Sequence, residues 1–171
     1  MDETTPSGPP APPAPVRAGL RIDRIYLRDL SFESPQVPGV FASEWKPQFR
    51  IELNTRANPL DDGRFEVVLM LNLEAKSGES TLFMAELQQA GIFHLEAAGE
   101  EERREALGIA CPDALFPYAR ETLDTLLVKG TFPPFMLAPV NFDTLYAEAK
   151  KRRESAQATG RPGGDGQTAG R

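Results

Sequence analysis

The sequence has few of the side chains on which most catalytic and metal sites depend. It contains one cysteine and one histidine in 171 residues. A single cysteine, Cys111, excludes an internal disulfide framework. His94 has no second histidine or cysteine at ligand spacing, so a zinc site is not expected. The sequence therefore offers little material for redox or metal chemistry.

Other catalytic patterns are missing as well. No glycine-rich phosphate loop follows a predicted strand, so nucleotide binding has no support. Successive side chains of the run Glu100–Glu105 point in different directions on a helix, so we interpret this run as a solvated face. Cys111 precedes a predicted helix start, where a thiolate would be favoured, but we interpret it as a small buried hydrophobic residue. We predict that the protein is not an enzyme and uses no cofactor.

Long apolar runs are also absent from the sequence. No segment approaches the roughly 20 apolar residues that span a bilayer. The first residues are acidic and lack the apolar stretch of a secretory signal. We therefore expect a cytoplasmic protein with no direct membrane insertion.

Basic residues are outnumbered, with 19 Lys and Arg against 25 Asp and Glu and a net charge of −6. An acidic body repels nucleic-acid phosphates, so nucleic acid is not an expected ligand. The run Lys150–Arg153 is the exception. It could be a tail for RNA or lipid, but we interpret it as cations that complement the dipole at a helix C-terminus.

The two ends of the chain differ from the rest in composition. Residues 1–18 are rich in proline, and residues 154–171 are rich in glycine. Neither segment can bury enough apolar area to offset the entropy of ordering, so both are predicted to be disordered. Residues 19–153 are predicted to form one folded domain.

Four segments show the alternation of apolar and polar residues that is typical of β-strands. The four runs are Leu20–Phe32, Phe49–Arg56, Phe65–Lys76 and Thr81–Phe93. The phase slips between Ile22 and Ile25, which predicts a β-bulge. The turn signals Asp61-Asp62-Gly63 and Ser77-Gly78 predict antiparallel pairing of consecutive strands.

Helical character follows the strands. Pro112 suits the first turn of a helix that ends at Gly130, and Pro117 predicts a late start or a bend in it. Asn141 can cap a last helix over Phe142–Arg153. Strands followed by helices predict an α+β fold, with helices on one face of a four-stranded antiparallel sheet.

The other face of the sheet also carries apolar residues. Val68, Met70, Leu82 and Met84 are apolar at positions outside the core phase of two neighbouring strands. An apolar second face in a small domain is most simply buried against another copy of the chain. We therefore expect an oligomer.

Two irregular segments hold a surplus of apolar residues. The connector Thr131–Val140 contains three prolines and no charge, with Phe132, Phe135, Met136 and Leu137 among its apolar residues. The connection Pro35–Pro47 contains Val37, Val40, Phe41 and Trp45. Contiguous apolar surface on such segments usually marks a site of interaction, so a groove between them is predicted.

Seven idiosyncratic segments occur in order between about Ile22 and Tyr146. They are IYLRDLSFESP (Ile25–Pro35), Trp45-Lys46-Pro47, FEVVL (Phe65–Leu69), ELQQAGIF (Glu86–Phe93), CPDALFPYARE (Cys111–Glu121), GTFPPF (Gly130–Phe135) and LAPVNFD (Leu137–Asp143). In these segments the chain resembles the SecB family of bacterial protein-export chaperones.

The resemblance implies a SecB-like α+β fold that assembles as a homotetramer, a dimer of dimers. It implies an ATP-independent holdase that binds unfolded preproteins and delivers them to the SecA ATPase of the Sec translocase. A SecB-like adaptor or carrier dedicated to one client, for example in a toxin–antitoxin system, remains the alternative. The long proline-rich start and the basic, glycine-rich end depart from the family pattern, so the resemblance leaves open whether the tails contact SecA.

The resemblance also implies three sets of site residues. The client-binding groove would use Phe41, Trp45, Tyr118, Phe132, Phe135, Leu137 and Tyr146. SecA would bind at Asp29, Glu33, Met84 and Glu86. The strand with Phe83, Ala85, Leu87 and Gln89 would lie in or near the subunit interface.

Overall fold

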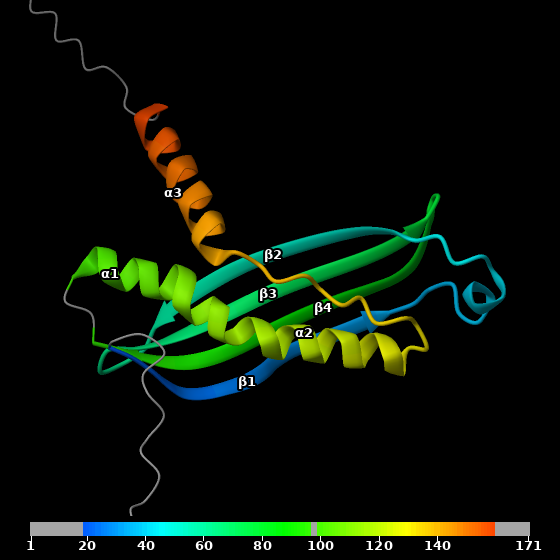
Figure 1. The fold of residues 1–171 in the computed structure, drawn as a ribbon, viewed down its shortest axis with the longest axis horizontal. Helices are drawn as coiled ribbons and strands as arrows, with labels where there is room; N and C mark the ends of the chain where they lie inside the picture. Colours follow the sequence, from blue (N-terminus) through cyan, green and yellow to red (C-terminus); the bar gives the residue numbers. More distant parts are fainter. Residues whose placement is uncertain (1–18, 97–98, 160–171) are drawn as a thin grey trace, which may run out of the picture.

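A four-stranded antiparallel sheet forms the body of the protein (Figure 1). The structure is a computed structural model that describes residues 19–96 and 99–159. The strands are β1 (Leu20–Glu33), β2 (Gln48–Pro59), β3 (Arg64–Ser77) and β4 (Ser80–Leu95), in the spatial order β1-β4-β3-β2. All four predicted strands are present.

Two tight turns join β2, β3 and β4 into a meander, as the turn signals predicted. Asp62 and Gly63 have φ values of 52° and 70°, the left-handed conformation that such hairpin turns require. β1 pairs with β4 instead of β2, so the connection Pro35–Pro47 crosses from one edge of the sheet to the other. The predicted bulge after Ile22 is confirmed by a shift in the β1–β4 register.

Three contiguous helical segments follow the sheet, and a further helix follows after the connector. They are α1 (Glu100–Glu105), the π-helical turn η2 (Ala106–Ala110), α2 (Cys111–Lys129) and, after the connector, α3 (Phe142–Thr159). Pro112 lies in the first turn of α2, as predicted, while Pro117 lies inside a helix that continues past it. The Asn141 side chain accepts a hydrogen bond from the Thr144 N–H at 2.9 Å, so the predicted cap is confirmed.

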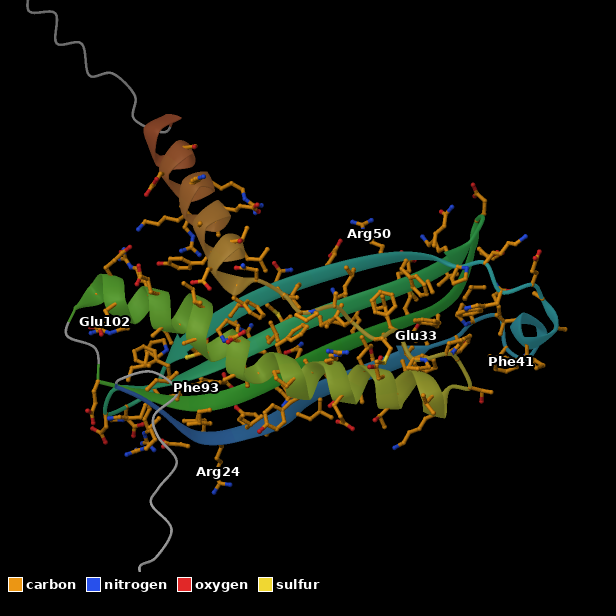
Figure 2. The ribbon with its side chains drawn as sticks, viewed as in Figure 1. Arg24, Glu33, Phe41, Arg50, Phe93 and Glu102 are labelled. Atoms are coloured by element: carbon orange, nitrogen blue, oxygen red, sulfur yellow. The ribbon has the colours of Figure 1, made fainter. Side chains whose placement is uncertain are left out.

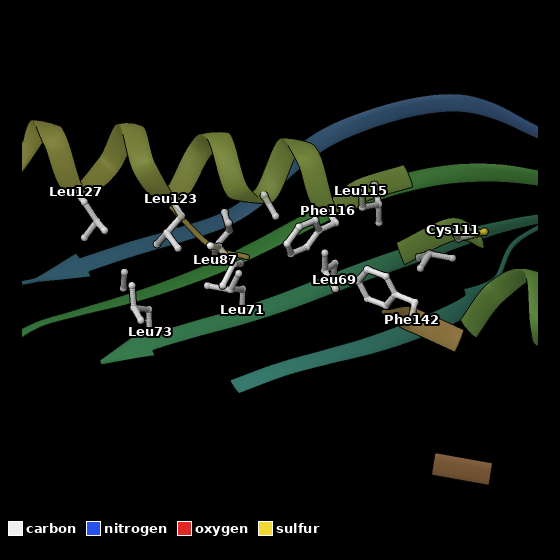
Figure 3. Packing of buried hydrophobic residues seen from close by; sticks show 14 of the residues in the cluster. Leu69, Leu71, Leu73, Leu87, Cys111, Leu115, Phe116, Leu123, Leu127 and Phe142 are labelled. Atoms are coloured by element: carbon white, nitrogen blue, oxygen red, sulfur yellow. The ribbon is translucent and has the colours of Figure 1, made fainter. Parts of the chain in front are cut away.

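The core lies between α2 and one face of the sheet (Figure 3). Leu115, Ala119, Leu123 and Leu127, spaced four residues apart, are fully buried against the strands. Cys111 is also fully buried, and this burial raises the pKa of its thiol to about 12. The thiol therefore stays protonated and unreactive at neutral pH.

A steric constraint explains the glycine at position 130, which follows the last residue of α2. Its φ of −76° is open to any residue, so the left-handed conformation does not explain the glycine. A Cβ at this position would lie 2.7 Å from the ring of Phe32. The glycine thus lets β1 and the end of α2 approach closely.

The apolar second face of the sheet is smaller than the sequence suggested. Val68 and Leu82 are buried within the chain itself, at 0% and 6% exposure. Val68 lies in the central strand β3, and a register shift after Ala75 places Leu82 with the core. The expectation that both residues need a second copy to cover them is wrong.

The last helix is longer than the sequence predicted. α3 continues to Thr159, beyond the boundary expected at Arg153. The segments 1–18 and 160–171, for which disorder was predicted, lie outside the described residues. Within 19–96 and 99–159, none of the helices combines the length and apolar character needed to cross a membrane.

Candidate functional site

An aromatic cluster brings together the connector after α2, the crossing after β1 and the strands between them. Phe132 is at its centre and is only 4% exposed. Its ring centroid lies 4.9 Å from that of Phe83 and 5.7 Å from those of Phe41 and Trp45. The cluster as a whole comprises Phe32, Phe41, Trp45, Phe49, Phe83, Phe132 and Phe135.

The outer members of the aromatic cluster are exposed. Phe41 is 52% exposed and lies on the short helix η1 (Gly39–Ala42), beyond the ends of the strands (Figure 2). Trp45 and Phe49 are 39% and 45% exposed. Buried inner rings therefore hold an outer apolar surface in place, and that surface is available to a partner.

Asp124 on α2 fixes the connector in position. Its Oδ1 atom accepts hydrogen bonds from the backbone N–H groups of Phe135 and Met136, both at 2.9 Å. Met136 has a φ of 53° and an exposed side chain. This role of Asp124 could not be predicted from the sequence, because an aspartate on a polar helix face is usually solvated.

The predicted client-binding residues do not form one group. Phe41, Trp45, Phe132 and Phe135 meet in the aromatic cluster, and Leu137 is buried in the core. Tyr118 is exposed on α2, and Tyr146 lies in a separate groove. Phe32 and Phe49 were not among the predicted client-binding residues, because their alternation in the strands marks them as core residues. The cross-strand register could have identified them as members of the aromatic cluster.

The separate groove lies between β2, η2 and α3 and has a volume of about 610 Å³. Tyr146 lines it and packs so closely on Gly108 that a Cβ there would clash with the tyrosine ring. The start of α3 is held by Phe142, whose ring meets that of Phe116 edge-on at 6.0 Å. We call this the α3 groove.

The predicted SecA-binding residues share the face of the sheet that points away from the helices. Glu33 lies opposite Met84, Ser31 opposite Glu86, and Asp29 opposite Gln88. Asp29, Glu33, Met84 and Glu86 are all exposed. The sequence had identified four residues that the fold does bring together, and we call this surface the acidic face.

Two further carboxylates extend the acidic face. Glu52 and Glu74 line a hollow of about 210 Å³ together with Met84 and Glu86. Glu52 pairs with Arg50 at 2.7 Å, and Glu74 with Lys76 at 2.9 Å. The sequence did not single these two out, because their position beside Glu86 follows from the pairing of β2 and β3 with β4.

Glu66 lies on the same side of the sheet but is engaged within the chain. Its carboxylate accepts hydrogen bonds from Tyr26 at 2.6 Å, from Asn58 at 3.0 Å and from Arg28. The bond from the Tyr26 hydroxyl is the main reason why the pKa of Glu66 is lowered. Glu66 therefore ties β1, β2 and β3 together and is not available to a partner.

The residues expected at the oligomer interface lie inside the protomer. Phe83, Ala85 and Leu87 are 1% exposed, and Gln89 is also buried. They share the face of Leu71 and Leu73 on β3, which α2 covers. Their side chains are covered by their own chain. A second copy could therefore contact this part of β4 only through the residues between them, whose side chains point to the opposite face of the sheet.

No cluster of His, Cys, Asp or Glu side chains within the described parts of the chain is arranged to hold a metal ion. The sites that the structure does present are apolar surfaces and a charged sheet face.

Comparison with known proteins decides the family. The family model described as "Preprotein translocase subunit SecB" matches residues 14–153. The chain belongs to the SecB family. A SecB relative, the protein-export protein SecB of Hahella chejuensis, is 53% identical over 85% of this chain and 91% of its own length. That of Azotobacter vinelandii is 52% identical over 84% of this chain and 89% of its own.

The fold agrees with this assignment. A Mycobacterium tuberculosis SecB-like chaperone, Rv1957, was solved in complex with a ChAD peptide from the HigA1 antitoxin. It superimposes with a TM-score of 0.60 over 72% of this chain and 91% of its own, at 19% identity. The predicted SecB-like α+β fold, with its four-stranded antiparallel sheet, is confirmed.

Proposed function

We propose that this SecB-family chain is an ATP-independent holdase that keeps unfolded preproteins competent for translocation. The exposed outer part of the aromatic cluster carries the proposal, because it presents Phe41, Trp45 and Phe49 to solvent on a buried support. The names of the similar export proteins support it. The protein would act in the cytoplasm, before its clients cross the membrane.

Apolar burial explains why such a surface accepts many sequences. The hydrophobic effect is non-directional, so any apolar side chain of a client can be bound. Each anchored side chain contributes roughly 1.5–3 kcal/mol. A folded client has buried its apolar segments and offers nothing to bind, so the surface selects unfolded chains without using nucleotide.

A single surface of this kind binds weakly. Ordering the client backbone costs about 1–2 kcal/mol per residue, which offsets most of the gain from each anchor. Several surfaces in one assembly gain affinity through effective concentration when a flexible client reaches more than one of them. A homotetramer, built as a dimer of dimers, is therefore part of the proposed mechanism.

Delivery to SecA would use the acidic face. Asp29, Glu33 and Glu86 are exposed, and none forms an ion pair with another described residue. They lie on the opposite side of the sheet from α2, so a basic partner surface could bind there while a client remains bound.

Removing the apolar anchors tests the client-binding proposal. Trp45→Ala combined with Phe135→Ala should weaken binding of an unfolded client at least about tenfold, because two anchors are lost. Titration calorimetry measures the affinity, and light scattering checks that the assembly is intact. The control Leu60→Ala removes an exposed leucine from the β2–β3 turn and should change neither. Unchanged affinity of the double variant would exclude the cluster as the client site.

A dedicated adaptor is the second candidate, since the similar SecB-like chaperone was solved with an antitoxin peptide. The breadth of clients separates the two functions. A general holdase suppresses aggregation of several unrelated unfolded proteins, whereas an adaptor protects one partner.

A further inference from the structure

The α3 groove combines an apolar floor with a basic rim. Its floor includes Leu53 of β2, Leu107 of η2 and Tyr146 of α3. Arg104, Arg152 and Arg153 also line it, and no Asp or Glu is among the described residues that do. Three arginines thus line a partly apolar hollow in a protein whose net charge is −6.

The run Lys150–Arg153 does not lie at the C-terminus of α3, so the prediction that it complements the helix dipole there is wrong. Cations complement the helix dipole only within the last turn. α3 continues to Thr159, and its last turn contains no basic residue. Arg152 and Arg153 lie well before the end of the helix, so the dipole does not explain them.

The arginines of the rim keep donors free. Arg104 pairs with Glu100 at 3.3 Å and Arg152 with Glu148 at 3.8 Å, and both pairs are exposed to solvent. Such pairs contribute little, and each guanidinium has five N–H donors. Arg153 forms no ion pair with any residue that the structure describes.

Lys150, by contrast, is engaged. Its ammonium group donates a hydrogen bond to the Glu101 carboxylate, which raises the pKa of Lys150 and lowers that of Glu101. This ion pair links α3 to α1, on either side of the groove. Lys150 therefore has a partner within the chain, and this pair does not occupy the arginines that line the groove.

We propose that the α3 groove binds client segments in which an apolar or aromatic residue is flanked by Asp or Glu. The apolar residue would enter the hollow, and the carboxylates would pair with Arg104, Arg152 and Arg153. The groove would extend the range of clients to acidic segments, which the acidic body otherwise repels. The inference rests on the proposed holdase function.

An anionic membrane is a poorer match for these residues. A bilayer surface attracts a protein through a broad basic face, whereas here three arginines line a recess in an acidic protein. A short acidic segment can enter that recess, while a flat anionic surface would also meet the surrounding carboxylates.

The test uses three short labelled peptides with one common apolar centre, flanked by Glu, Gln or Lys. The full chain should bind the Glu-flanked peptide about tenfold more tightly than the Gln-flanked one, with a difference that shrinks as salt is added. The triple variant Arg104→Gln, Arg152→Gln, Arg153→Gln should lose this difference. The control variant Arg21→Gln, Arg24→Gln, Arg50→Gln removes equal charge from β1 and β2 outside the groove and should keep it (Figure 2).

Several results would overturn the proposal. Equal binding of the Glu- and Lys-flanked peptides would do so, as would a preference that survives in the triple variant or disappears in the control. Loss of binding to phosphatidylserine vesicles in the triple variant, with peptide binding unchanged, would assign the arginines to lipid instead. Binding of the Gln-flanked peptide distinguishes failure of this proposal from failure of the proposed holdase function. If neither the original chain nor any variant binds this peptide, the holdase function itself fails. If the original chain and all variants bind it equally, the holdase function stands.

Discussion

Phe132 and Trp45 show how one aromatic cluster divides into support and binding surface. Phe132 is buried at the centre, whereas Trp45, at 5.7 Å from it, is 39% exposed. The sequence predicted both as client-binding residues, because a loop rich in aromatics does not reveal which rings face inward. Which rings face inward depends on Phe32 and Phe83, which contact Phe132 from strands that are distant in the sequence.

Asp124 is expected to stabilise the connector and, through it, the client surface. Asp124→Ala should weaken client binding several-fold and lower the free energy of unfolding by about 1.5–3 kcal/mol, because two backbone N–H groups lose a charged acceptor. Client titration and urea denaturation measure the two effects. The amide oxygen of Asp124→Asn can still accept a hydrogen bond, so this variant should recover most of the affinity.

Asp113→Ala is the matched control, because Asp113 is exposed in the first turn of the same helix. It should leave client affinity unchanged. If Asp124→Ala binds client as the original chain does, the connector holds its shape without Asp124, and the role given to this residue is wrong.

The elements that local sequence determines were predicted, and those that distant pairing determines were not. The turn glycines, Pro112 and the Asn141 cap act within a few residues, so the β2–β4 meander and the starts of α2 and α3 could be predicted. The place of β1 beside β4, and the burial of Leu82, depend on pairings and register across the whole sheet. The sequence contains no local signal for them.

Gly108 is expected to determine how closely α3 packs on η2. Gly108→Ala should push Tyr146 out of its position and loosen the contact of α3 with η2, because the added methyl group overlaps the tyrosine ring. The free energy of unfolding should fall by about 1–3 kcal/mol, as in other overpacked sites. Hydrogen exchange should show faster exchange in the first turns of α3.

Gly99→Ala is the control for this substitution, since a Cβ at Gly99 meets nothing within 4 Å. Its exchange pattern should match that of the original chain. Unchanged protection of α3 in Gly108→Ala would mean that Tyr146 does not anchor the helix.

At the scale of the whole molecule, charge and apolar surface are separated by the sheet. The acidic face lies on one side, and α2 with the connector lies on the other. The sequence predicted the members of the acidic face through the family resemblance. It did not locate the α3 groove, which forms only where β2, η2 and α3 meet.

Charge reversal tests whether the acidic face is the SecA site. Glu33→Lys with Glu86→Lys should abolish capture of SecA, because two exposed carboxylates become repulsive, and client binding should persist. A pull-down with SecA and a parallel client titration measure both. Glu79→Lys with Glu105→Lys changes the charge equally outside this face. SecA capture that survives in the first variant, or is lost in the second, contradicts the assignment.

Trp45 reports directly on client binding, because it is the single tryptophan of the chain and lies in the proposed client surface. An unfolded client that lacks tryptophan can therefore be titrated while the emission of Trp45 alone is recorded. We expect a saturable blue shift of the Trp45 emission as client side chains cover the indole, at the same concentrations that suppress client aggregation. Client protection with an unchanged Trp45 emission would show that unfolded chains bind elsewhere on the molecule.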